Sequence, residues 1–311
     1  MNINRINDFI TLDKNDITAL FAPFDMSIGI INFSLKDSMS NTGYEVTTTK
    51  GRFFLKLYSN TTDKIETAVY RYLKNKINVP KLFYYDGIKE KFPFTYTITE
   101  FIDGVSLISH VRNNLKYPPE KSFEIGRMCA AIHKKKYTHD ALLDDKLNSS
   151  RELPYTRDKI LRLINGKPGN HLNVVTVEKL KAFIGDNSTL FDRIEAESVL
   201  CHGDFGYGNI MISDEKIYLI DFEFAYAGSI YNDIGHFFRR KGIDVQALID
   251  DRIYNSFADG YNSVSDTQLP SDWFRLARLC DINAMLCLLN HDGVPAEWIE
   301  DIEADILYSI C

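Results

Sequence analysis

The chain has 311 residues, of which 45% are hydrophobic and 25% are charged. These proportions are typical of a globular protein and exclude a chain that is disordered over most of its length. Lysine and arginine number 36 against 43 aspartates and glutamates, so the net charge is −7. This acidic balance disfavours a general nucleic-acid binder, which needs a basic face. At about 150 residues per domain, the length predicts two domains.

The cysteines and the first residues indicate the compartment. The five cysteines are scattered without a Cys-x-x-Cys pair, and an odd number leaves at least one unpaired. Residues 1–20 lack the apolar central region of a signal peptide, and no run approaches the roughly 18 apolar residues that span a bilayer. We therefore expect a cytoplasmic protein whose partners include neither nucleic acid nor a membrane.

Residues 24–99 are predicted to form strands interrupted by one helix. The β-rich runs 44–49 and 52–58 are joined by Lys50-Gly51, a turn signal at hairpin spacing. Because strand side chains alternate between faces, Lys56 is expected at mid-strand with aromatic neighbours.

The helix of this region and its last strand mark a boundary. Apolar residues at helical spacing follow the N-cap types at 61–63 and end before Val79-Pro80. Alternation then predicts a strand over 94–99, which leads into a hinge at 100–104. We place the domain boundary there, which divides the chain into residues 1–103 and 104–311.

Beyond the hinge the pattern becomes helical. Apolar residues at helical spacing predict an amphipathic helix over 125–132, and the stretch 273–289 is apolar on nearly all sides and should be buried. Two short strands, around 199–200 and 217–220, flank the densest cluster of unusual residues.

This cluster carries the chemistry. It runs from His202-Gly203-Asp204 to Asn209, and Asp221 follows twelve residues after Asn209. Phosphoryl transfer needs positioning, charge neutralisation and an oriented nucleophile. Asp204, in a loop after a strand, suits a base that accepts the proton of a substrate hydroxyl, while Asn209 and Asp221 offer the oxygen ligands that Mg²⁺ prefers. The alternative is that both aspartates are ordinary turn residues.

The cluster resembles the catalytic and metal-binding loops of the aminoglycoside phosphotransferase and choline kinase group, small-molecule kinases of the protein-kinase-like fold. Residues 224–235, with their Asn-Asp-Ile-Gly ending, resemble the segment that follows in that group. The resemblance covers about residues 33–289. It implies an α+β fold of two lobes, an N-terminal antiparallel sheet with one helix and a mainly helical C-terminal lobe. It also implies that ATP is the phosphate donor, with GTP as an alternative, and that Mg²⁺ is the metal cofactor.

The resemblance assigns a phosphate-binding role to Lys56. A cation on a strand facing the cleft is the usual arrangement in kinase-like proteins, and Glu66 is expected to pair with it. A capping box with Asp63 is the alternative role for Glu66.

Other nucleotide contacts rest on the same resemblance. Ser40 and Asn41 lie in the segment 38–43, where the group has its phosphate-covering loop, although the Gly-x-Gly-x-x-Gly pattern is absent and an ordinary hairpin turn is the alternative. At the hinge, the carbonyl of Glu100 and the amide of Ile102 are expected to hold adenine.

Three histidines near the cluster are predicted to be structural, and two alternative functions are remote. We expect His202, His133 and His236 to be structural, with His202 anchoring the loop. An iron oxygenase with a facial triad of His202, Asp204 and His236 is a remote alternative, since it leaves the conspicuous Lys56 and Asn209 unexplained. A non-catalytic pseudokinase is equally remote, because the base, the lysine and the metal ligands are all present.

The acceptor is predicted from charge and from the resemblance. The insert 137–198 and the C-terminal helices are expected to line its site. The middle Gly203 is more typical of aminoglycoside phosphotransferases, so we expect a cationic hydroxyl compound, an aminoglycoside, and an antibiotic-resistance kinase. A choline, ethanolamine or homoserine-type metabolite kinase is the alternative. Ammonium groups are expected to pair with the surplus carboxylates Asp186, Asp192, Glu195, Glu297, Glu300 and Asp301.

Overall fold

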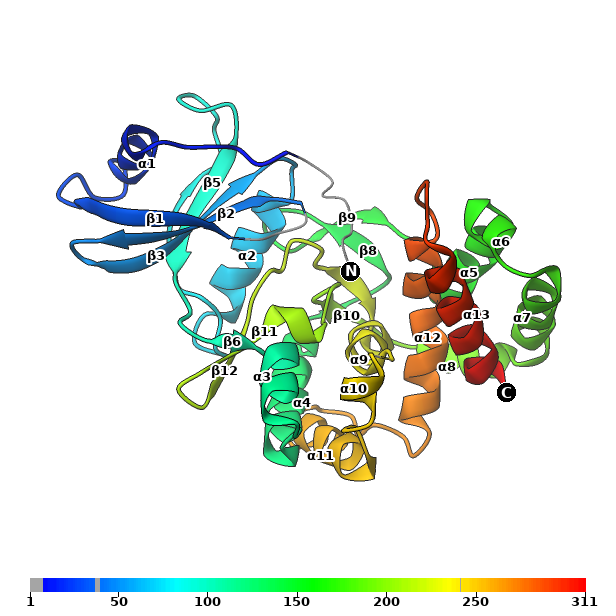
Figure 1. Ribbon diagram of the computed structural model, residues 1–311. Coiled ribbons are helices and arrows are strands. Elements are labelled where there is room, and N and C mark those ends of the chain that lie inside the picture. Colours follow the sequence, from blue (N-terminus) through cyan, green and yellow to red (C-terminus); the bar gives the residue numbers. More distant parts are fainter. Residues whose placement is uncertain (1–7, 37–39, 241) are drawn as a thin grey trace. The chain divides into compact units, whose positions relative to one another are not determined.

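The computed structural model describes residues 8–36, 40–240 and 242–311 (Figure 1). The chain divides into two compact units. The first comprises Met1–Val105, Asp144–Leu147 and Met211–Phe224, and the second comprises Ser106–Leu143, Asn148–Ile210 and Ala225–Cys311. The division predicted at residues 103 and 104 is continuous in sequence, whereas the first unit also gathers two later segments, one of which carries Asp221.

The first unit is built on a five-stranded antiparallel sheet in the order β1-β2-β3-β5-β4. The predicted hairpin is present, with Thr48 opposite Gly51. Apolar side chains of β3 such as Leu55 pack with Ile17 and Phe21 of helix α1 in a buried core. Helix α2 contacts β4 and β5. The elements are α1 (Lys14–Phe21), β1 (Ile30–Lys36), β2 (Thr42–Thr48), β3 (Gly51–Tyr58), α2 (Asp63–Leu73), β4 (Leu82–Asp86) and β5 (Thr95–Glu100).

The second unit is mainly helical. Four of its helices pack in pairs, α4 against α11 and α9 against α12. Its aromatic core contains Phe237, Phe238, Phe257 and Trp273, whose rings pack against one another. The helices are α3 (Leu107–Asn114), α4 (Pro119–His133), α5 (Thr156–Ile164), α6 (Lys167–His171), α7 (Val174–Asp186), α8 (Ser188–Ile194), α9 (Ile230–Phe238), α10 (Ile243–Gln246), α11 (Asp251–Asn262), α12 (Trp273–Leu288) and α13 (Ala296–Ile310).

Two further sheets carry the loops of the cluster. One has the order β7-β10-β13-β8-β9 and consists of β7 (Lys136–Tyr137), β10 (Ser198–Cys201), β13 (Tyr226–Ser229), β8 (Ala141–Leu143) and β9 (Ser149–Glu152). The other has the order β12-β11-β6 and consists of β12 (Lys216–Leu219), β11 (Ile210–Ser213) and β6 (Val105–Ser106). A short 3₁₀ helix, η1 (Tyr207–Asn209), precedes β11.

The predicted elements are present. The helices expected over 125–132 and 273–289 correspond to α4 and α12, and most of the apolar side chains of α12 are buried. The short strands expected around 199–200 and 217–220 are β10 and β12. Among the described residues, no helix combines the length and the hydrophobicity needed to cross a bilayer.

Candidate active site

Lys56 lies at the centre of a charged network in the first unit. Strand β3 holds its Nζ atom 2.8 Å from Glu66 Oε2 and 2.6 Å from Asp221 Oδ1. Glu223 Oε2 lies 3.6 Å from the same nitrogen. The predicted pair of Lys56 with Glu66 is therefore confirmed. The alternative capping box at the start of α2 is absent, since the N-cap residue Thr62 makes no side-chain capping bond.

Two tyrosines complete the network around Glu66. Tyr58 donates a hydrogen bond of 2.7 Å to Glu66 Oε2, and Tyr70 donates one of 3.0 Å to Oε1. The hydroxyl of Tyr70 also accepts a bond of 3.1 Å from the amide of Asp221, whose φ of 66° lies in the left-handed region. Sequence reasoning missed both tyrosines. Their spacing was the available signal, because Tyr58 shares a strand face with Lys56 and Tyr70 lies one helical turn beyond Glu66.

Glu223 connects the network to the segment around residue 40. Its buried carboxylate accepts a bond of 2.8 Å from Ser40 Oγ and another from Asn41 Nδ2. Thr62 Oγ1 lies 3.3 Å from Oε2 of the same carboxylate. Ser40 and Asn41 thus lie beside the Lys56 network, and residues 38 and 39 of the expected phosphate-covering loop are outside the described residues. No role for Glu223 was predicted from the sequence.

The network has more negative than positive groups. Burial by itself would lower the pKa of Lys56, but the carboxylates around it raise that pKa well above its usual value. Burial raises the pKa of Glu223, although Lys56 acts against this. Carboxylate oxygens of Glu66, Asp221 and Glu223 lie within 4.8 Å of one another. Three carboxylates facing one ammonium group suit a divalent cation with oxygen ligands such as Mg²⁺.

The two hinge residues lie at the end of the same sheet. Glu100 is the last residue of β5, where its amide donates 2.9 Å to the carbonyl of Lys81. Ile102 follows in irregular backbone. Their contacts with adenine stay a prediction.

In the second unit, Asp233 holds the loop that carries Asp204. Its carboxylate accepts bonds of 2.7 Å from the amide of His202 and 3.1 Å from that of Gly203. His133 Nε2 lies 3.2 Å from the same carboxylate. Burial opposes the charge of Asp233, but these donors lower its pKa below the usual value. His202 is fully buried and its Nδ1 accepts a bond from the amide of Asp204, as expected of a structural histidine.

The carboxylate of Asp204 is held at both oxygens. Asn209 Nδ2 donates 2.7 Å to Oδ2, and His236 Nε2 lies 3.2 Å from Oδ1. The side chain of Asp204 is nevertheless 39% exposed, so a substrate can reach it. Because the amide nitrogen of Asn209 faces Asp204, its amide oxygen is the atom available to a metal. The sequence predicts only a structural role for His236, whereas the structure places its ring beside the carboxylate of Asp204. Its position one turn after Asp233 on α9 was the signal that could have placed it at this loop.

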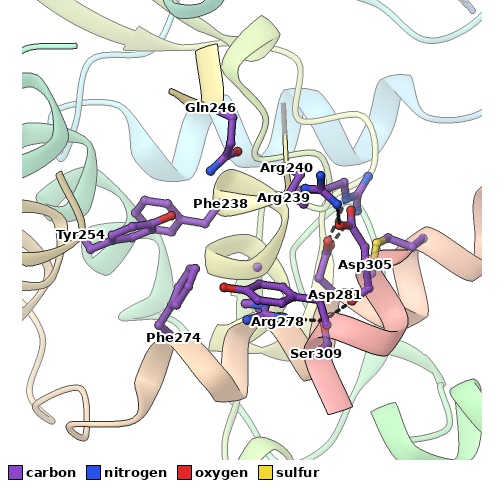
Figure 2. A pocket seen from close by; sticks show the side chains of 13 residues that line it. Phe238, Arg239, Arg240, Gln246, Tyr254, Phe274, Arg278, Asp281, Asp305 and Ser309 are labelled. Carbon is purple, nitrogen blue, oxygen red and sulfur yellow. Dashed lines mark hydrogen bonds and ion pairs between the residues drawn. The ribbon is translucent and has the colours of Figure 1, made fainter. Parts of the chain in front are cut away.

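A cavity of about 420 Å³ opens in the second unit, between residues of α9, α10, α11, α12 and α13 (Figure 2). Helix α9 links it to Asp204, since Gly235 and Arg239 line the cavity on either side of His236 in the sequence. None of the six carboxylates expected to face the acceptor lines this cavity. Asp192 and Glu195 instead pair with Arg157.

Comparisons with known proteins place the chain in a family. The model of the phosphotransferase enzyme family, APH, matches residues 34–271. The chain belongs to this family. Sequence reasoning had reached the same group, and the prediction of an enzyme, a small-molecule phosphotransferase, is confirmed. The iron oxygenase alternative is thereby excluded. No curated protein matches the chain significantly.

Solved structures of this family share the fold. Aminoglycoside phosphotransferase APH(4)-Ia is 14% identical with a TM-score of 0.67, and the match covers 94% of this chain and 97% of that one. Choline kinase from Cryptosporidium parvum is 14% identical with a TM-score of 0.62, covering 96% and 94%. Choline kinase LicA from Streptococcus pneumoniae is 14% identical with a TM-score of 0.61, covering 96% and 98%. The predicted α+β, protein-kinase-like fold is confirmed.

Proposed function

We propose that this phosphotransferase moves the γ-phosphate of ATP to a hydroxyl group of a small molecule. The observation that carries the proposal is the Lys56 network, a lysine on a central strand whose Nζ lies 2.8 Å from Glu66 and 2.6 Å from Asp221. A lysine held rigidly in this way suits binding of the α- and β-phosphates of a nucleotide. Solved relatives with ADP and with AMP support a nucleotide as the donor. GTP remains an alternative donor.

The chemistry is assigned to a few side chains. Asp204 accepts the proton of the acceptor hydroxyl, whose oxygen forms the new bond to the γ-phosphorus while the bond to the β-phosphate oxygen breaks. Asn209 and His236 orient the carboxylate of Asp204 for this step. Asn209 and Asp221 are the proposed Mg²⁺ ligands, and Mg²⁺ supplies charge neutralisation on the phosphates when bound.

The remaining nucleotide contacts complete the proposal. Ser40 and Asn41, which donate hydrogen bonds to Glu223, lie beside the proposed phosphate-binding lysine and offer polar groups to the phosphates. The carbonyl of Glu100 and the amide of Ile102 would hold adenine. The scattered cysteines support a reducing compartment such as the cytoplasm.

Two acceptor classes rest on different observations. A cationic acceptor, an aminoglycoside, is supported by the likeness to a phosphotransferase solved with hygromycin B and by the net charge of −7. Gly203 gives little support to an aminoglycoside acceptor. Its φ of 82° is left-handed, and glycine and asparagine both tolerate that conformation, so the backbone alone accounts for this residue. A homoserine-type acceptor is supported by the arginines of the cavity.

An assay of acceptor-dependent ADP release tests the phosphotransfer. The panel comprises kanamycin, hygromycin B, choline, ethanolamine and homoserine. We expect Asp204→Asn to lower kcat by about 10²- to 10⁴-fold, the usual effect of losing a general base. Asp259→Asn, at an exposed position of the second unit, is the matched control and should leave kcat unchanged. Activity that persists in excess chelator, or an active Asp204→Asn variant, would contradict the proposed chemistry.

A further inference from the structure

The charges of the cavity are unequal in number. Three arginines line it, Arg239, Arg240 and Arg278, against the two aspartates Asp281 and Asp305. Arg239 makes a bidentate pair with Asp281, with nitrogen to oxygen distances of 2.8 and 2.6 Å. Arg240 pairs with Asp305 at 2.7 Å. Each aspartate therefore already has an arginine partner, and one cation is in excess.

Arg278 is the cation in excess. Its guanidinium carbon lies 3.5 Å from the centre of the Tyr308 ring. Its Nη2 atom lies 3.3 Å from Ser309 Oγ, and both residues are labelled in Figure 2. Within the part of the chain that the structure describes, no carboxylate forms an ion pair with it. Burial lowers its pKa, and its interactions with Tyr308 and Asp305 oppose this only in part. A half-buried guanidinium that lies against an aromatic ring and has no carboxylate partner among the described residues is suited to bind a planar carboxylate.

Part of the cavity wall is aromatic, and helix α9, which contacts the proposed base through His236, also lines the cavity. Phe238, Tyr254 and Phe274 line the wall around Arg278 (Figure 2). Arg239 directly follows α9 and lies three residues after His236, whose ring lies 3.2 Å from Asp204. An acceptor in the cavity therefore lies beside the helix that contacts the proposed base.

We propose that the acceptor of this enzyme carries a carboxylate that binds Arg278, in addition to the hydroxyl group that is phosphorylated. The inference rests on the proposed function and narrows its acceptor. Such a site would favour hydroxy acids and zwitterions with an apolar portion over polyamines without an acid group. The reason is that Arg278 is a cation without a carboxylate partner among the described residues.

Binding of a simple probe tests this independently of turnover. Phenylacetate combines a ring with a carboxylate, and phenylacetamide is its neutral isostere. We expect calorimetry to show that phenylacetate binds the full chain more tightly than phenylacetamide does. Arg278→Gln should lower the affinity for phenylacetate by about tenfold or more, the usual effect of losing a charged hydrogen bond. Arg275→Gln, at an exposed position of the same helix, is the control and should have no effect.

A second variant and three possible results decide whether Arg278 binds the carboxylate. Arg278→Lys, which retains the charge, should bind phenylacetate with intermediate affinity, and it serves as the test if the glutamine variant has a lowered Tm. Equal affinity for phenylacetate and phenylacetamide, equal affinity of Arg278→Gln and the wild type, or no binding of phenylacetate at millimolar concentration would each overturn the proposal.

Turnover distinguishes failure of this inference from failure of the proposed function. Serine and ethanolamine, homoserine and 3-aminopropanol, and carnitine and β-methylcholine are pairs that differ by one carboxylate. We expect the acid of at least one pair to have the higher kcat/KM, and Arg278→Gln to remove that preference. Phosphorylation of the amines or hygromycin B alone, unaffected by Arg278→Gln, overturns the inference and leaves phosphotransfer standing. Phenylacetate binding through Arg278 without turnover of any acceptor supports the anion site and contradicts only the proposed phosphotransfer.

Discussion

Replacing Glu66 by alanine should destabilise the first unit, because one buried carboxylate holds three donors. Its side chain is 2% exposed and accepts from Lys56 at 2.8 Å, Tyr58 at 2.7 Å and Tyr70 at 3.0 Å. Removing one partner of a buried ion pair costs about 3–5 kcal/mol. Lys56 retains Asp221 at 2.6 Å, so we expect the lower end of this range, about 3 kcal/mol. Glu66→Gln keeps an acceptor and should cost about half as much.

Urea denaturation at pH 7 measures this loss. Asp103→Asn is the matched control in the same unit, since Asp103 is 77% exposed and pairs with Arg52 at 2.7 Å. An exposed pair of this kind contributes at most about 1 kcal/mol. The reasoning is refuted if Glu66→Ala unfolds within about 1 kcal/mol of the wild type, or if it unfolds no more easily than Asp103→Asn.

Three further predictions follow from the same geometry. Asp204→Ala should lose turnover by about 10²-fold or more while nucleotide affinity, measured by calorimetry, stays unchanged; a parallel loss of nucleotide affinity would contradict its role as a base. Gly203→Ala should cost about 1–2 kcal/mol of stability at its left-handed φ of 82°, and Gly203→Asn less; equal costs in denaturation would contradict the backbone argument. The native pKa of Lys56 is raised, so its stabilisation is complete below the unfolded value of 10.5 and is lost as pH rises through the native pKa. The stability difference between the wild type and Lys56→Met should therefore be constant from about pH 7 to 10 and shrink above that; a difference that grows with alkaline pH would be inconsistent.

Much of the site could be predicted because its chemistry depends on short, regular spacings. Strand alternation placed Lys56 at mid-strand, and the spacing of His202, Asp204 and Asn209 indicated a loop with a base and a metal ligand. These features need only a few consecutive residues. The hairpin of β2 and β3 and the helix α2 followed from equally local patterns.

Contacts between segments that are far apart in the sequence could not be predicted from local patterns. Asn41 and Glu223 are 182 residues apart, and no local pattern brings them together. The choice between a capping box and an ion pair for Glu66 likewise depended on how α2 packs against the sheet. His236 shows the same limit, because no local pattern indicates that its Nε2 atom lies 3.2 Å from Asp204.

The sequence by itself determined the fold class, the family and the loop chemistry, since these depend on periodicity and on motifs of fixed spacing. Only the tertiary structure decided the charge of the proposed acceptor cavity. The net charge of −7 is a sum over the whole chain and predicted a cationic ligand. Packing of α9, α12 and α13 instead pairs Asp281 and Asp305 with arginines and leaves Arg278 without a carboxylate among the described residues. The sign of a cavity depends on which charges the fold brings together there, and composition does not contain that information.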